Sequence, residues 1–128
     1  MDLLVNIDVD DVERAIAFYG AALGLTVKRR FDGGFTELTG ATARIFLLPN
    51  AAGTAPFPGG GVRTYARHWT PLHLDFVVED VDAAVERACA AGAKLESGIL
   101  PRSWGRIAIL GDPFGHGFCL LEFVGDDY

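Results

Sequence analysis

The sequence predicts an α+β fold made of two similar units, each a strand, a helix and three further strands. The first indication is an internal repeat between LLVNIDVDDVERAI near the start and PLHLDFVVEDVDAAV in the second half. Aligning Asp80 with Asp11 also places His73 on Leu4. The second indication is the order of the patterns, because each copy alternates as a strand does and then changes to helical spacing.

The first unit begins with a half-buried strand at Leu3–Val9, where apolar and polar residues alternate. A helix follows from Val12, since apolar residues recur there at helical spacing, and Gly24 ends it. Turn residues then separate three more expected strands, which are Leu25–Phe31, Phe35–Leu38 and Ala43–Leu48.

The second unit repeats this order. A strand at Leu72–Val78 leads into a helix from about Val81 to Ala91, with Gly92 at its end. The remaining strands are expected at Ala93–Ile99, Arg106–Leu110 and Gly117–Val124. With 128 residues the two units form one compact domain, in which residues 1–48 are the first module and residues 72–128 the second.

Residues 49–71 form a linker, because they hold four of the six prolines and the run Gly59-Gly60-Gly61. A linker of this length inside a compact domain is usually functional or mobile. Its second half is aromatic, and Trp69 is one of its rings. Two interpretations stay open: a loop packed over a sheet edge, or a lid over a cleft.

Composition excludes several function classes. The net charge of −6 disfavours a nucleic-acid partner, which needs a basic surface. The start lacks the features of a signal peptide, and no stretch approaches the roughly 20 apolar residues of a membrane span. Cys89 and Cys119 give no disulfide framework and are interpreted as small buried side chains. We therefore expect a cytoplasmic protein without a membrane partner.

Three stretches resemble the vicinal oxygen chelate superfamily: VDDVERAIAFYGAALGL, HLDFVVEDVDAAVERACAAGA and WGRIAILGDPFGHGFCLLEF. That superfamily includes glyoxalase I, bleomycin resistance proteins, extradiol dioxygenases, methylmalonyl-CoA epimerase and the thiol transferase for fosfomycin. The resemblance implies two βαβββ modules whose curved sheets surround a cleft, and modules commonly paired in a homodimer. One such scaffold hosts many chemistries, so the fold does not fix the function.

The resemblance also implies metal ligands on the first and last strands of each unit. Carried over by position, these are Leu4, Phe46, His73 and Glu122. Leucine and phenylalanine donate no nitrogen or oxygen, so the implied metal site is incomplete. We expect no cofactor, with a divalent metal held by His73 and Glu122 as the alternative.

Strand alternation gives a second set of candidate residues, independent of the family. We expect a cleft face that is apolar with a few polar groups, as ligand sites are. Its carboxylates would be Asp8, Asp75 and Glu122, and its only cation Arg44. The other expected lining residues are Leu4, Asn6, Phe46, Leu48, Val77, Phe118 and Leu120, with Trp69 and Trp104 at the mouth.

His73 and Glu122 have three interpretations. They form a residual metal pair, a general acid and base pair, or a structural hydrogen bond in a half-buried strand. The sequence therefore predicts a glyoxalase- or bleomycin-resistance-like protein that binds a small organic molecule in an apolar, partly acidic cleft without a complete metal site. The alternative is a metal-dependent lyase, isomerase or dioxygenase that uses His73 and Glu122.

Overall fold

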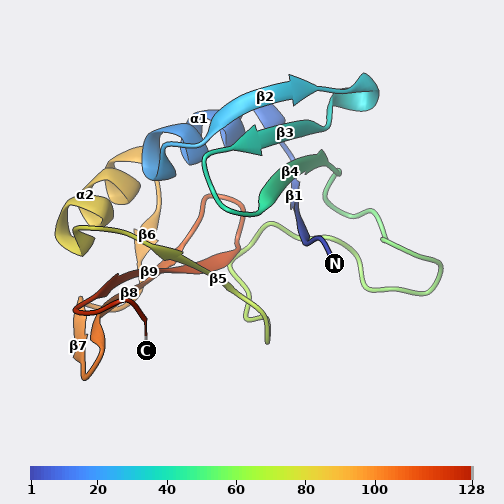
Figure 1. Ribbon diagram of the computed structural model, residues 1–128. Coiled ribbons are helices and arrows are strands. Elements are labelled where there is room, and N and C mark those ends of the chain that lie inside the picture. Colours follow the sequence, from blue (N-terminus) through green and yellow to red (C-terminus); the bar gives the residue numbers. More distant parts are fainter. Residues whose placement is uncertain (128) are drawn as a thin grey trace. The chain divides into compact units, whose positions relative to one another are not determined.

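The computed structural model describes residues 1–127 and divides the chain into two compact units. The first unit holds residues 1–65, and the second begins at Ala66. Each unit contains one helix and one mixed sheet, so the predicted α+β class with two repeated units is confirmed (Figure 1). The linker predicted at residues 49–71 is shared between the units and forms no helix or strand after Pro49.

Sheet 1 belongs to the first unit and has the strand order β1-β4-β3-β2. The outer strand β1 runs parallel to β4, and the other pairs are antiparallel. The elements of this unit are β1 (Leu4–Val9), α1 (Val12–Leu23), β2 (Thr26–Arg30), the short 3₁₀ turn η1 (Asp32–Gly34), β3 (Thr36–Thr39) and β4 (Arg44–Pro49).

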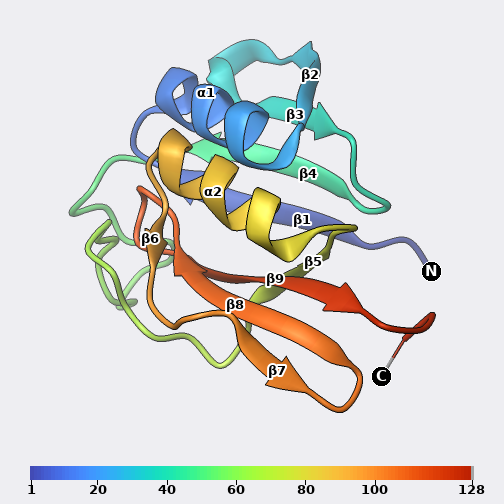
Figure 2. The ribbon, with the colours of Figure 1, turned by 90° about the vertical axis from the view of Figure 1, so that its left-hand side faces the viewer.

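Sheet 2 belongs to the second unit and has the order β5-β9-β8-β6, with β7 also paired to β8 (Figure 2). The outer strand β5 runs parallel to β9, as β1 does to β4. The elements are β5 (Leu74–Val77), α2 (Val81–Ala91), β6 (Lys94–Leu95), β7 (Leu100–Arg102), β8 (Gly105–Gly111) and β9 (Gly117–Phe123). The strand expected at Ala93–Ile99 is too long, because only Lys94–Leu95 of it forms a strand, β6. The strand β7 begins after that range, at Leu100, and the sequence pattern did not indicate it.

Both helices begin and end through the same interactions, which explains why the repeat predicts them well. Asp11 accepts a hydrogen bond from the Arg14 amide at 3.0 Å, and Asp80 accepts one from the Ala83 amide at 3.0 Å. Such side chains satisfy backbone donors that a helix start leaves free. Gly24 then ends α1 in a left-handed conformation with φ of 69°.

In each unit the helix packs on one face of the sheet, α1 against β2 and β4, and α2 against β8 and β9. Among residues 1–127, the other face of each sheet carries no helix of the same unit. In unit 2 the helix-covered face carries Phe118 and Leu120, both buried, and the N-terminus of α2 is hydrogen-bonded to Glu122 of β9. In unit 1 the buried side chains Val9 and Leu47 lie on one face of sheet 1. We call the face opposite to these residues the open face of each sheet.

The linker is attached to both units by side chains. Arg63 donates to Asp8 of β1 at 2.6 Å, and the Tyr65 hydroxyl donates to the Asn50 carbonyl at 2.6 Å. In unit 2, Arg67 forms two hydrogen bonds with Glu96, at 2.5 and 2.9 Å. These contacts fit a loop packed against its own unit, and the function of a lid stays a prediction.

No helix among residues 1–127 is both long enough and apolar enough to cross a membrane.

The turn between β7 and β8 depends on a glycine. Gly105 has φ of 153°, and a Cβ placed on it would lie 1.9 Å from the Glu122 carbonyl oxygen of the paired strand. We expect Gly105→Ala to lower the free energy of unfolding by at least about 2 kcal/mol, because backbone strain and a steric clash add. Urea denaturation measures this change.

Gly98→Ala is the matched control, because a Cβ there meets no atom within 4 Å. It should leave stability within about 0.5 kcal/mol of the parent. Equal urea midpoints for the two variants would contradict the described pairing of β8 with β9.

Candidate functional site

The open face of sheet 2 carries a cluster of three polar side chains: His73, Asp75 and Cys119. Asp75 of β5 and Cys119 of β9 are paired in the parallel register, so both project from the same face. His73 lies two residues before Asp75, and its Nδ1 atom is 2.7 Å from Asp75 Oδ1. The same Nδ1 atom is 3.8 Å from Cys119 Sγ. One donor atom from each side chain lies within 4.8 Å of those of the other two.

The protonation state of Cys119 limits what the cluster can do without a metal. Burial, together with the neighbouring Asp75 carboxylate, raises the pKa of the Cys119 thiol to about 12. A cysteine nucleophile is activated by a lowered thiol pKa or by an adjacent general base that removes the thiol proton. Here Asp75 and Cys119 both approach Nδ1 of His73, whereas a catalytic triad uses both ring nitrogens. The geometry therefore does not support nucleophilic catalysis by Cys119.

Apolar side chains surround this polar cluster on the open face. Val77 continues the strand that carries Asp75 and is largely exposed. Ile109 pairs with Cys119, and Ile107 pairs with Leu121, which lies on the same face as Cys119 and is buried. Near the other end of β9, the rings of Trp104 and Phe123 lie 5.4 Å apart. The open face of sheet 2 thus combines an aliphatic and aromatic surface with one polar corner.

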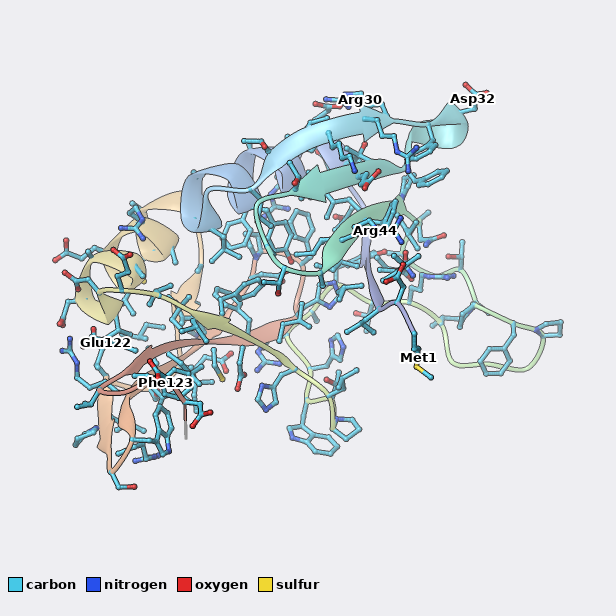
Figure 3. All side chains as sticks on the ribbon, viewed as in Figure 1. Met1, Arg30, Asp32, Arg44, Glu122 and Phe123 are labelled. Carbon is cyan, nitrogen blue, oxygen red and sulfur yellow. The ribbon has the colours of Figure 1, made fainter. Side chains whose placement is uncertain are left out.

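Glu122 lies on the opposite face, which corrects the predicted pairing of His73 with Glu122. Its carboxylate accepts a hydrogen bond from the Val81 amide at 2.8 Å and bonds to Arg106 at 2.7 and 3.3 Å. Figure 3 shows Glu122 on the α2 side of β9 and its neighbour Phe123 on the other side. The hydrogen bond from Val81, followed by the contacts with Arg106, lowers the pKa of Glu122. Glu122 therefore stabilises the start of α2.

The error has a simple physical reason. The alternating pattern predicts that Phe118, Leu120 and Glu122 share the face of His73, but Phe118 pairs with Leu74 on the helix-covered face. The alternate residues of β9, which begin with Cys119, face His73 instead. Shifting an alternating pattern by one residue moves every side chain to the other face. The sequence analysis therefore did not identify Cys119 as a neighbour of His73. Only the parallel register of β5 with β9 shows that it lies on that face.

The predicted residues of unit 1 do share one face. In the parallel pair of β1 with β4, each residue on this face of β1 lies beside its counterpart on β4. The three pairs are Leu4 with Arg44, Asn6 with Phe46, and Asp8 with Leu48.

The structure corrects part of the expected acidic lining of the cleft. Asp8 is neutralised by Arg63 and also accepts a hydrogen bond from Asn50 at 2.8 Å. Glu122 lies on the helix-covered face of sheet 2. Of the three predicted carboxylates, Asp75 lies on an open face and is paired there with His73. Of the two predicted mouth residues, Trp69 is exposed and Trp104 packs on Phe123.

A metal would find three different donors in unit 2. An imidazole nitrogen, a thiolate and a carboxylate are a donor set that suits zinc and similar divalent metals, and not calcium or magnesium. Binding would displace the thiol proton of Cys119 and the contact between His73 and Asp75. The three residues therefore fit a metal site with three protein ligands. This set contains His73 but has Asp75 and Cys119 in place of the predicted Glu122.

A sequence profile of the glyoxalase-like domain matches residues 4–121. The chain is 36% identical over 118 residues to the anthracycline biosynthesis protein DauV of Streptomyces sp. (strain C5), covering 92% of this chain and 40% of DauV. It is 34% identical over 120 residues to the protein Mb0911c of Mycobacterium bovis, covering 91% of this chain and 79% of Mb0911c. The chain thus spans about two-fifths of the length of DauV.

Solved structures share the fold. TnmS3, an antibiotic binding protein from Streptomyces sp. CB03234, has a TM-score of 0.69 at 24% identity, over 96% of this chain and 95% of TnmS3. The fosfomycin resistance protein FosX from Listeria monocytogenes has a TM-score of 0.71 at 19% identity, over 94% of this chain and 90% of FosX. The resemblance to the vicinal oxygen chelate superfamily is confirmed.

Proposed function

Because the chain belongs to the family of glyoxalase-like domains, we propose that it binds a small organic molecule on the open face of sheet 2. The observation that carries this proposal is the combination of an exposed apolar surface with one polar corner. Binding sites for organic molecules are mostly apolar and use a few placed polar groups for orientation. Here His73 and Asp75 are those groups, since their hydrogen bond fixes both side chains while leaving them accessible.

The apolar part supplies the affinity. Val77 is 64% exposed and Ile109 is 37% exposed, so a bound ligand removes aliphatic surface from water at both positions. Full burial of an exposed aliphatic side chain contributes about 1.5–3 kcal/mol, so these partly exposed side chains contribute a corresponding fraction of that free energy. The ring pair of Trp104 and Phe123 adds a surface on which a planar apolar ligand can pack.

Two relatives support a ligand of this kind. DauV is described by its part in anthracycline biosynthesis, and TnmS3 is described as an antibiotic binding protein. We propose a comparable ligand for this chain, with a planar apolar part and a polar group that reaches His73. Because Asp8 is paired with Arg63 and Glu122 lies on the helix-covered face, a positive charge on the ligand is no longer required.

The two faces of sheet 2 provide a matched test. Ile109 (37% exposed) lies on the open face, and Leu95 (38% exposed) pairs with Leu110 on the helix-covered face. We expect an anthracycline to raise the melting temperature, because a ligand that binds the folded state stabilises it. Ile109→Gln should weaken binding about tenfold, since it replaces buried apolar contact with an unpaired amide. Leu95→Gln should bind as the parent does.

Isothermal titration of the three proteins gives the dissociation constants. Equal weakening by both substitutions, or none by Ile109→Gln, would place the ligand elsewhere. A panel that adds a bleomycin-type glycopeptide and a small aromatic amine keeps the test independent of one compound. If no compound of the panel raises the melting temperature, the proposed function is contradicted.

A second candidate function is metal-dependent chemistry, favoured by the three converging donors of His73, Asp75 and Cys119. A crystal structure of a FosX variant contains Mn(II), so a protein of this fold can bind a metal ion. A metal bound to this cluster would act as a Lewis acid that polarises an oxygen of the ligand. The residues of the chain would hold the metal, while Val77 and Ile109 would position the apolar part of the substrate and exclude water.

Zinc titration separates this candidate from simple ligand binding. We expect His73→Ala and Cys119→Ser each to lower zinc affinity at least tenfold, because each removes one of three ligands. Binding should release a proton from the thiol, so affinity should rise with pH. Glu122→Gln is the control and should leave zinc affinity unchanged, since Glu122 bonds to Val81 on the opposite face.

If Glu122→Gln lowers zinc affinity as much as His73→Ala does, the metal ligands are His73 and Glu122, as the sequence predicts. No measurable zinc binding by the parent would leave the organic ligand as the function of this face.

A further inference from the structure

The first unit carries a group of basic and aromatic side chains that the proposed function does not use. The segment from Thr26 to Phe46 holds four basic residues and two acidic ones, although the whole chain has a net charge of −6. Within it, Lys28, Arg29, Phe31, Phe35 and Phe46 lie around the buried carboxylate Glu37, and we call these five residues the basic aromatic patch.

Glu37 fixes the two cations of the patch. It pairs with Phe46 in the register of β3 with β4, and its side chain is 0% exposed. Lys28 donates to Glu37 at 3.2 Å and Arg29 donates to it through Nε. Burial acts to raise the pKa of Glu37, but the hydrogen bonds from Arg29 and Lys28 outweigh burial and lower it. The carboxylate is therefore ionised at neutral pH, and the three charges sum to one positive charge.

Both cations keep hydrogen-bonding capacity. The side chains of Lys28 and Arg29 are each 54% exposed. Within residues 1–127, the Nη atoms of Arg29 and the remaining protons of the Lys28 ammonium form no further hydrogen bond. A guanidinium held through Nε presents its Nη groups in a fixed plane, which suits a two-oxygen anion.

The aromatic members lie directly beside these donors. Phe31 and Phe35 stack with their centroids 4.1 Å apart and their planes 1° apart. Both rings lie 6.4 Å from the ring of Phe46 on the open face of sheet 1. The guanidinium carbon of Arg29 lies 4.6 Å from the centroid of Phe31. A flat ligand can thus contact a ring surface and the Arg29 donors at the same time.

We propose that the basic aromatic patch binds a planar aromatic carboxylate. The ring of the ligand packs on the half-buried rings of Phe31 and Phe35, and its carboxylate accepts hydrogen bonds from the Nη atoms of Arg29 and from Lys28. Charge complementarity selects an anion, because Glu37 neutralises one of the two cations and leaves the other. The patch lies in sheet 1, so it goes beyond the ligand proposed for sheet 2 and is tested separately.

The neighbouring arginine provides a matched control. Arg30 follows Arg29 on the same strand but pairs with Glu13 of α1, with one hydrogen bond of 3.1 Å, and so projects to the other face. We titrate the parent, Arg29→Gln and Arg30→Gln with 2-naphthoate and with its uncharged analogue 2-naphthamide, and follow amide NMR shifts of residues 26–46. The parent should bind the carboxylate at least about tenfold more tightly than the amide, as expected for one lost charge-assisted hydrogen bond.

Arg29→Gln should weaken naphthoate binding about tenfold and leave naphthamide binding unchanged, whereas Arg30→Gln should change neither. Removing Arg29 alone leaves the buried Glu37 with one cation, so a second comparison avoids an unfolded variant. The double variant Arg29→Gln/Glu37→Gln should bind naphthoate at least about tenfold less tightly than Glu37→Gln alone. Equal affinities in this comparison, equal binding of acid and amide by the parent, or equal weakening by Arg30→Gln would overturn the proposal.

Discussion

The parallel pairing of β5 with β9 decides which side chains meet on the open face of the second unit. It places Asp75 beside Cys119 and brings His73 to the same face, and it directs Glu122 to the start of α2. The first unit uses the same pairing between β1 and β4, but there Asn6 lies beside Phe46. One repeated fold therefore produces a polar corner on sheet 2 and an aromatic surface on sheet 1, because the paired positions carry different side chains.

The fold was largely predictable from the sequence, whereas the site was not. Asp11 and Asp80 at the helix starts, and Gly24 at a helix end, are local signals that need no tertiary contact. No local signal indicates which residues of β9 lie on which face of the sheet. All residues of the run Phe118, Cys119, Leu120 and Leu121 are suited to burial, so apolar and polar residues do not alternate there. Only the strand partner fixes which of them faces His73, and that information is non-local.

Charge predictions failed for a related reason. An alternating pattern places a carboxylate on a face but does not identify its partner, and here the partners come from other segments of the chain. Arg63 reaches Asp8 from the linker, 55 residues later in the chain, and Arg106 reaches Glu122 from the neighbouring strand. Once these pairs are known, the open face of sheet 1 has a local positive excess around Glu37, and the acidic surplus of the chain lies elsewhere.

The central claim is that Glu122 belongs to the start of α2 and not to the cluster with His73. The most direct measurement is NMR of the Val81 amide between pH 2 and 8, in the parent and in Glu122→Gln. Because the pKa of Glu122 lies below its ordinary value of 4.5, its hydrogen bond is present at neutral pH and is lost as pH falls through that lowered pKa. The Val81 amide proton should shift in one step below pH 4.5 in the parent and not in the variant, while the His73 ring signals stay the same in both. A change in the His73 signals on Glu122→Gln, with a Val81 amide that does not titrate, would contradict the account.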